Sequence, residues 1–184
     1  MSRNYVLISP CRDEADYMRR TLDSVVAQTD RPGLWVIVDD GSTDATPQIL
    51  AEYAAAHDWI RVVPKPNRGM RAVGPGVIEA FYAGLDTVDL SAFDYLCKLD
   101  LDLDLPPGYF AGLMDRMEAD PRIGSCSGKP WFTWHGARVS EKCGDEMSVG
   151  MTKFYRRACF EEIGGFVREV MWDAIDCHKS RQLG

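Results

Sequence analysis

Three carboxylates alternate with leucines in residues 98–107, which read KLDLDLDLPP. If the strand predicted for residues 95–99 continued, Asp100, Asp102 and Asp104 would share one face at two-residue spacing. Three carboxylates on one face repel each other unless a cation neutralises them. Their hard oxygen atoms suit Mg²⁺ or Mn²⁺, and either ion can also hold a substrate diphosphate. The pattern favours a divalent metal site, and the alternative is an edge strand of solvated acids.

Two further groups of acids could bind a ligand or take part in catalysis. Asp39 and Asp40 end a predicted strand and precede Gly41. They fit simple turn chemistry or hydrogen bonds to a base or ribose, as in nucleotide-binding folds, and both readings stay open. Asp173 follows Trp172 near the end of the sequence. Its position alone favours a helix cap, and the alternative is a partly desolvated carboxylate acting as a general base.

The elements that position these groups alternate between strand and helix. Short apolar runs predict buried strands at residues 5–9, 34–38, 60–63 and 95–99. Apolar residues at helical spacing predict helices over residues 14–28, 78–85 and 173–183. Two more helices are predicted to begin at Pro47, with Thr46 as the N-cap, and at Pro107. This alternation predicts a parallel sheet with helices on both faces. Ligands bind beyond the carboxyl ends of such strands, so the segment 10–12 and the strand-end acids should meet in one crevice.

Composition and charge narrow the function classes. The 184 residues are 46% hydrophobic and carry a net charge of −7, as expected for one soluble domain. The acidic balance argues against nucleic acid, but a metal can offset the charge of a nucleotide. No apolar run reaches the roughly 18 residues that span a bilayer. A cytoplasmic location is expected, and peripheral membrane docking stays open. The six cysteines lack Cys-x-x-Cys spacing, which argues against a zinc site.

The order and spacing of these segments resemble family 2 glycosyltransferases of the GT-A fold, from about residue 4 onward. The matching strings are Pro10-Cys-Arg-Asp-Glu14, Val38-Asp-Asp-Gly-Ser-Thr-Asp44, Asn67-Arg-Gly-Met-Arg71, Gly74-Pro-Gly-Val-Ile-Glu-Ala80, Lys98-Leu-Asp-Leu-Asp102, Gly164-Gly-Phe166 and Trp172-Asp173. Asp13 stands where the family usually has Asn, and Trp172 where it usually has Glu. The resemblance implies an α/β fold with a Rossmann-like, mostly parallel central sheet flanked by helices. It implies a single catalytic domain over 1–184. Residues 1–105 would form the nucleotide-sugar half, and 106–184 an acceptor and catalytic part that is short at its C-terminus.

The resemblance also implies roles. The enzyme would be an inverting glycosyltransferase that moves a sugar from a UDP- or similar nucleotide-sugar to a sugar, lipid-linked or other acceptor. Polysaccharide or glycoconjugate synthesis is the expected setting, and a homodimer stays open. The expected nucleotide-sugar-binding residues are Pro10, Arg12, Glu14, Asp39, Asp40, Arg71 and Asp100. Asp102, with Asp100, would bind Mn²⁺ or Mg²⁺. Asp173 would be the general base, with Asp176 as the next candidate.

Several alternatives stay open. A nucleotidyltransferase-like enzyme should carry an N-terminal Gly-rich loop, which residues 8–20 lack. A phosphoacceptor signalling domain would not need the acids at 100–104, and a catalytically incomplete donor-binding domain is the third alternative. The aromatic residues near Trp131 and Trp134 fit an acceptor platform or the core equally well. The basic side chains after residue 150 could meet a phosphate, although a solvated face is slightly favoured; they are Lys153, Arg156 and Arg157.

Overall fold

A computed structural model describes residues 3–70, 74–141, 144 and 146–183. The described residues form a six-stranded sheet in the order β3-β2-β1-β4-β8-β5. Its strands are β1 (Tyr5–Cys11), β2 (Leu34–Asp39), β3 (Ile60–Pro64), β4 (Tyr95–Leu99), β5 (Ser125–Cys126) and β8 (Thr152–Arg156). The first four strands run parallel, and β8 runs antiparallel to both β4 and β5. The predicted α/β fold with a mostly parallel sheet is confirmed.

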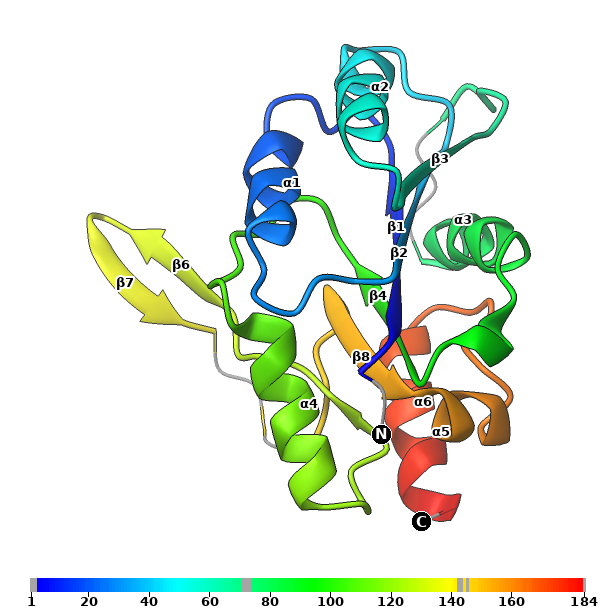
Figure 1. Cartoon of the computed structure of the whole chain (residues 1–184), viewed down its shortest axis with the longest axis vertical. Helices are drawn as coiled ribbons and strands as arrows, with labels where there is room; N and C mark the ends of the chain where they lie inside the picture. Colours follow the sequence, from blue (N-terminus) through cyan, green and yellow to red (C-terminus); the bar gives the residue numbers. More distant parts are fainter. Residues whose placement is uncertain (1–2, 71–73, 142–143, 145, 184) are drawn as a thin grey trace.

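Helices cover both faces of this sheet (Figure 1). One face carries α1 (Met18–Val26), α2 (Thr46–Ala56) and α4 (Tyr109–Ala119). The other carries α3 (Pro75–Leu85), α5 (Arg157–Glu162) and α6 (Trp172–Leu183). The strand pleat separates the two cores, since alternate side chains point to opposite faces. Tyr5 and Leu7 of β1 therefore pack toward α4, whereas Val6 and Ile8 pack toward α3.

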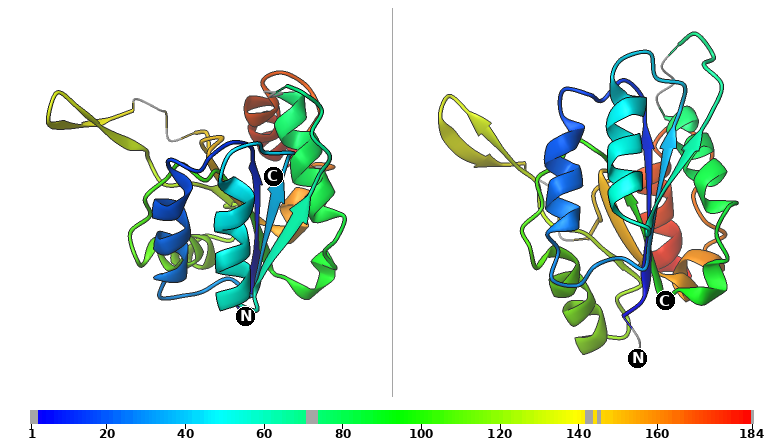
Figure 2. Two further views of the ribbon diagram at one scale, coloured as in Figure 1. Left: turned by 90° about the horizontal axis from the view of Figure 1, so that it is seen from above. Right: turned by 45° about the horizontal axis from the view of Figure 1, so that its top comes forward.

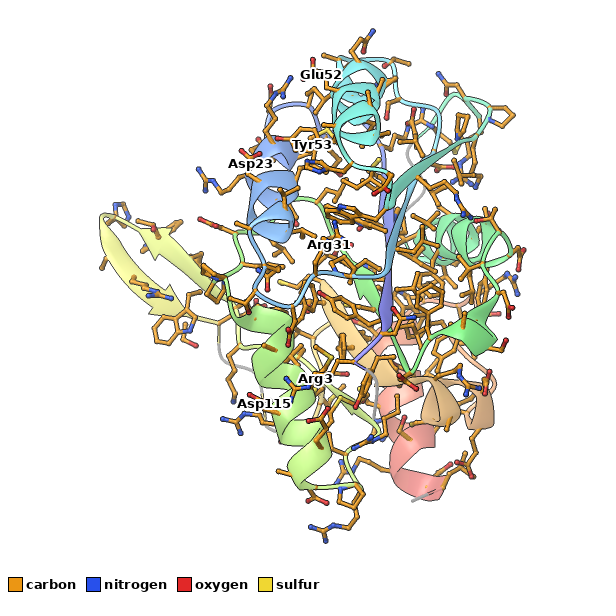
Figure 3. All side chains as sticks on the ribbon, in the orientation of Figure 1. Arg3, Asp23, Arg31, Glu52, Tyr53 and Asp115 are labelled. Carbon is orange, nitrogen blue, oxygen red and sulfur yellow. The ribbon has the colours of Figure 1, made fainter. Side chains whose placement is uncertain are left out.

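Close packing and polar ties fix the helices on the sheet. Gly84 lets α3 approach β2, because a Cβ there would lie 2.7 Å from Val38 Cγ2. On the other face, the Tyr53 hydroxyl donates to Asp23 and so joins α2 to α1 (Figure 3). Arg3 just before β1 pairs with Asp115 on α4 in the same way. The helices are thus held at fixed positions on the two faces of the sheet.

The predicted strands begin where expected, but several boundaries differ. β1 continues through Pro10 to Cys11 because it pairs only with β2 beyond Ile8, so the missing proline N–H costs no hydrogen bond to β4. The helix predicted from residue 14 begins at Met18, and the preceding residues form turns. The helix predicted from Pro107 begins at Tyr109. No helix among the described residues is long and apolar enough to cross a membrane.

The predicted end of β4 is confirmed, whereas one predicted helix cap is wrong. β4 ends at Leu99 and the chain bends after it, so the acids do not share one face of a strand and the edge-strand alternative does not hold. Thr46 is the first residue of α2 and not its N-cap. Asp44 takes the capping role, since its carboxylate accepts the Thr46 N–H at 2.8 Å and the Ala15 N–H at 3.1 Å. Partial burial opposes ionisation of Asp44, but these hydrogen bonds outweigh it and lower the pKa of its carboxyl.

The region without clear periodicity contains a hairpin, β6 (Trp131–Trp134) and β7 (Ala137–Ser140). Figure 2 shows it standing away from the helices and the central sheet. The chain then returns through residues 147–151 to β8, which inserts between β4 and β5. This return brings residues from the second half of the chain against the end of β4, where the acidic segment begins.

Candidate functional site

A cleft of about 620 Å³ opens at the carboxyl ends of β1, β2 and β4. The residues singled out from the sequence that line it are Pro10, Arg12, Glu14, Asp40, Asp100, Asp102 and Asp173. The predicted meeting of strand-end segments in one crevice is therefore observed for these residues. Asp39 and Asp104 do not belong to the lining. Arg71 lies outside the described residues.

Asp40 lines the cleft directly after β2, beside two cations that were not predicted as site residues. Its carboxylate forms an ion pair with Arg68, and Lys65 Nζ lies 3.0 Å from its Oδ1. The Lys65 contact lacks hydrogen-bond alignment, so the described residues leave this buried Oδ1 without a hydrogen-bond donor. Arg12 contacts the main chain of the same residue, since its Nη1 donates to the Asp40 main-chain oxygen at 2.7 Å. The only sequence signal for these cations is the Asn-x-Gly string, in which Arg68 is the middle residue and which begins two residues after Lys65.

The neighbouring acids build the turn on which Asp40 sits. Asp39 Oδ1 accepts the Ser42 N–H at 2.9 Å, so the turn reading fits its carboxylate. Asp13, which stands where the family usually has Asn, accepts the Thr43 N–H at 2.7 Å. Gly41 has a φ of +75°, and a Cβ there would lie 2.4 Å from the Asn67 Cα. A glycine is required because two loops cross in contact at this point.

The acidic segment forms the middle of the cleft. Lys98, almost fully buried, donates to the Asp100 carboxylate and to the Gly150 main-chain oxygen at 3.0 Å. The Asp100 N–H donates to the Met151 oxygen at 2.9 Å, which ties the segment to the returning chain. Asp102 is exposed and faces the cleft, so only two of the three alternating carboxylates reach it.

These two carboxylates match one kind of metal site. Among the described residues, no group of three or more His, Cys, Asp or Glu side chains is placed to hold a metal ion. Mg²⁺ commonly binds through one or two carboxylates and completes its shell with water and substrate phosphates. Asp100 and Asp102 offer the hard oxygen ligands for such a site, provided that a substrate supplies the remaining ligands.

Asp173 lies in the first turn of α6 and faces the same cleft. Gly150 makes room for its carboxylate, since a Cβ at that position would lie 2.9 Å from Asp173 Oδ2. Lys153 Nζ donates to the Asp173 main-chain oxygen at 2.6 Å and fixes the start of the helix. The return of the chain through Gly150 therefore links the acidic segment to Asp173.

Trp172, which replaces the usual Glu, is buried between cations and aromatic rings. Lys98 Nζ lies 5.2 Å from its ring centroid, and Lys153 Nζ lies 5.8 Å away. Its ring also meets the Phe166 ring edge to face, with centroids 4.9 Å apart. The Gly164-Gly-Phe166 string and the Trp172-Asp173 string thus pack directly on each other. An indole in this position supports the helix that carries Asp173 and leaves its carboxylate in the cleft.

A buried ion pair lies behind this helix. Lys153 Nζ is 2.8 Å from Asp176 Oδ1 and 2.7 Å from Oδ2, and the Tyr155 hydroxyl donates to the same carboxylate. Burial and the Asp176 charge raise the pKa of Tyr155, which keeps its hydroxyl protonated as a donor. Both ion-pair side chains are fully buried. The prediction of a solvated face for Lys153 is therefore wrong, and Asp176 is too enclosed to reach an acceptor.

The remaining basic and aromatic candidates lie away from the cleft, and one cysteine lines it. Arg156 donates to the Ile123 main-chain oxygen at 3.0 Å, and Arg157 pairs with Glu161 at 2.9 Å. The hairpin tryptophans are exposed, which rules out the core reading for them. Cys11 lines the cleft, but burial and the nearby carboxylates raise the pKa of its thiol well above the usual value. A protonated thiol is a poor nucleophile.

The sequence is similar to those of known glycosyltransferases. The sequence pattern of glycosyl transferase family 2 matches residues 6–169. The chain is 39% identical to the putative glycosyltransferase EpsH of Bacillus subtilis over 159 residues, covering 86% of this chain and 42% of EpsH. It is 28% identical to the poly-beta-1,6-N-acetyl-D-glucosamine synthase of Staphylococcus aureus over 123 residues, covering 65% of this chain. That match spans only 27% of the synthase.

Solved structures show the same GT-A fold. The mannosyltransferase PcManGT from Pyrobaculum calidifontis, solved with GDP-Man and Mn²⁺, has a TM-score of 0.69 at 22% identity. The structural match covers 98% of this chain and 51% of the mannosyltransferase chain. GalNAc-T7, solved with UDP, GalNAc and Mn²⁺, has a TM-score of 0.73 at 16% identity, covering 98% of this chain and 41% of its own. Together with the match over residues 6–169, these likenesses establish that the chain belongs to glycosyl transferase family 2.

Proposed function

We propose that this chain carries the catalytic centre of an inverting glycosyltransferase that uses a nucleotide-sugar donor, in polysaccharide or glycoconjugate synthesis. The observation that carries the proposal is the convergence of Asp40, Asp100, Asp102 and Asp173 on one cleft. These acids come from three separate segments of the chain. They would serve the nucleoside, the diphosphate and the acceptor hydroxyl in that order along the cleft.

The nucleoside end of the site is proposed at Asp40. Its buried Oδ1 has no hydrogen-bond donor among the described residues, and a buried acceptor of this kind gains from a ligand N–H or O–H. A base or ribose hydroxyl would supply that donor. Lys65 and Arg68 beside it would offset the negative charge of the nucleotide. Glu14, Pro10 and the undescribed Arg71 are proposed to complete this end.

The diphosphate end is proposed at the acidic segment. Asp102, with Asp100, would hold Mn²⁺ or Mg²⁺, and PcManGT and GalNAc-T7 were both solved with Mn²⁺. When bound, the ion would stabilise the negative charge that develops on the departing diphosphate. Lys98 would keep Asp100 oriented toward the cleft, because its ammonium bridges that carboxylate and the Gly150 oxygen.

The acceptor end is proposed at Asp173. Its carboxylate would take the proton of an acceptor hydroxyl while that oxygen forms a bond to the anomeric carbon of the donor sugar. The bond from the anomeric carbon to the diphosphate oxygen breaks, and its electron pair leaves with the diphosphate. Attack from the side opposite the leaving group inverts the anomeric configuration. Poly-beta-1,6-N-acetyl-D-glucosamine synthase, by its name, makes a beta-linked product, which is compatible with this course.

Calorimetric titration tests the donor site directly. UDP and GDP are titrated into the protein in Mn²⁺ and in EDTA, after a thermal-shift screen of nucleotide-sugars has identified the base. A ligand that binds only the folded state raises stability by about 2.7 kcal/mol at a hundredfold excess over Kd. Asp102→Asn should weaken binding in Mn²⁺ much more than Asp104→Asn, a matched acid outside the cleft lining. Equal affinity in Mn²⁺ and EDTA, or equal effects of the two variants, would contradict the metal role.

A further inference from the structure

The β6–β7 hairpin has two chemically different faces. In an antiparallel pair, directly opposite residues share one face. Phe132 pairs with Val139 and Trp134 pairs with Ala137, so one face of the hairpin is wholly apolar. These side chains are exposed, with 49% of Phe132, 61% of Trp134 and 37% of Val139 accessible to solvent. Among the described residues, neither hydrophobic core draws a side chain from the hairpin.

The opposite face is mixed, with one exposed tryptophan beside polar and cationic side chains. Thr133 pairs with Arg138, and Trp131 pairs with Ser140. The Arg138 guanidinium lies 5.0 Å from the Trp131 ring centroid, in a cation–π contact. Residues 129–141 contain Lys129, Arg138 and one acid, Glu141, whose N–H donates to the Pro130 main-chain oxygen at the base of the hairpin. Two cations and one acid give this segment a net charge of +1, on a protein whose net charge is −7.

We propose that this hairpin docks the protein onto a bilayer that contains anionic phospholipid. The apolar face would enter the interfacial region, where tryptophan is favoured because it joins an apolar ring to a polar N–H. Arg138 would lie among the anionic headgroups and add attraction that salt screens. A carbohydrate fits the apolar face less well, because sugars need several hydrogen-bonding partners and this face offers only the indole N–H of Trp134.

The hairpin leads directly into the cleft. Glu141 follows the last residue of β7 and lines the cleft, as do Gly144 and Met147 in the same loop. The hairpin itself stands away from the central sheet (Figure 1). Docking through its apolar face would therefore bring the mouth of the cleft close to the bilayer surface, within reach of membrane-associated molecules.

Vesicle flotation tests the proposal. The protein is mixed with phosphatidylcholine vesicles, with or without phosphatidylglycerol, at low and high salt. We expect binding to the anionic vesicles that high salt weakens. Phe132→Ser/Trp134→Ser should reduce that binding by about tenfold or more, because two aromatic side chains no longer leave water. Val170→Ser, which removes another highly exposed apolar side chain elsewhere, is the matched control and should bind like the wild type.

Each other outcome overturns the proposal. Wild-type protein that stays unbound with anionic vesicles excludes bilayer docking, and so does a double variant that binds as well as the wild type. If the double variant instead changes the oligomeric state or the affinity for an oligosaccharide, with no vesicle binding by the wild type, the hairpin serves a second copy or a glycan. Far-ultraviolet circular dichroism and nucleotide titration of the double variant confirm that the fold and the cleft are intact.

Discussion

Two acid–base clusters lie near the cleft, and their burial differs sharply. The Asp40 cluster consists of Asp40, Lys65 and Arg68, whose cationic side chains keep 24% and 30% of their surface exposed. The Asp176 cluster consists of Lys153, Tyr155 and Asp176, and its ion pair is fully buried. A partly exposed pair can exchange its partners with a ligand at little cost. An enclosed pair cannot, because separating it leaves a buried charge without compensation. The first cluster is suited to binding and the second to holding the position of Asp173.

The largest effect on stability should come from removing the cation of the Asp176 cluster. Lys153→Met leaves Asp176 buried without its cation, which should destabilise the protein by about 3–5 kcal/mol in chemical denaturation. Lys153→Met/Asp176→Leu removes both charges and should recover most of that stability. Transfer by the double variant should stay low, because the Asp173 main-chain oxygen has lost its donor. A double variant that recovers stability and full activity together would show that the cluster does not position Asp173.

A second prediction concerns the contact between the two parts of the cleft. Gly150→Ala places a Cβ 2.9 Å from Asp173 Oδ2 and should displace this carboxylate. Misplacing a reacting group by about 1 Å can cost on the order of a hundredfold in rate, so kcat should fall by about that much. Donor affinity should hold. Gly112→Ala in α4, where a Cβ meets nothing within 4 Å, is the control and should leave kcat unchanged.

The smallest effect on stability should come from the Asp40 cluster. In Asp40→Asn, Lys65 can turn toward water and Arg68 keeps its ion pair with Glu79 at 3.3 Å, so the melting temperature should change little. Nucleotide affinity should fall about ten- to a hundredfold, because a hydrogen bond to a charged group contributes about 1.5–3 kcal/mol. Calorimetry measures the affinity and thermal denaturation the stability. A large fall in melting temperature with unchanged affinity would make the Asp40 cluster structural, like the Asp176 cluster.

The same contrast explains how much the sequence could predict. Buried strands can be predicted from the sequence because short runs of consecutive apolar residues are typical of them. The starts of β1 and β4 are accordingly predicted correctly. Acids at strand ends follow from the fold, since parallel strands direct their carboxyl ends to one edge. The local pattern could therefore place Asp40 and Asp100 in one crevice. The residues next to Asp40 and Asp100 in the sequence were enough to predict these positions.

The Asp176 cluster depends on pairings that local patterns do not contain. Lys98 and Lys153 lie directly opposite each other on β4 and β8, although 55 positions separate them in sequence. Two buried lysines side by side are acceptable only because Asp100 and Asp176 each neutralise one of them. Read alone, Lys153 is a polar residue in an aperiodic segment, which favours solvent. The hairpin was hidden for a similar reason, since its aromatic residues resemble core residues until the fold shows them exposed.

The most direct test of the account is the rate of sugar transfer by Asp173→Asn, compared with Asp104→Asn, at saturating donor and Mn²⁺. The asparagine keeps the shape of the aspartate but cannot take the acceptor proton. Positioned general bases contribute about 10²–10⁴-fold, so kcat should fall by that factor while donor affinity stays constant. Asp104→Asn should transfer at the wild-type rate, because Asp104 lies outside the cleft lining. A near-wild-type rate for Asp173→Asn would contradict the assignment of Asp173 as the base.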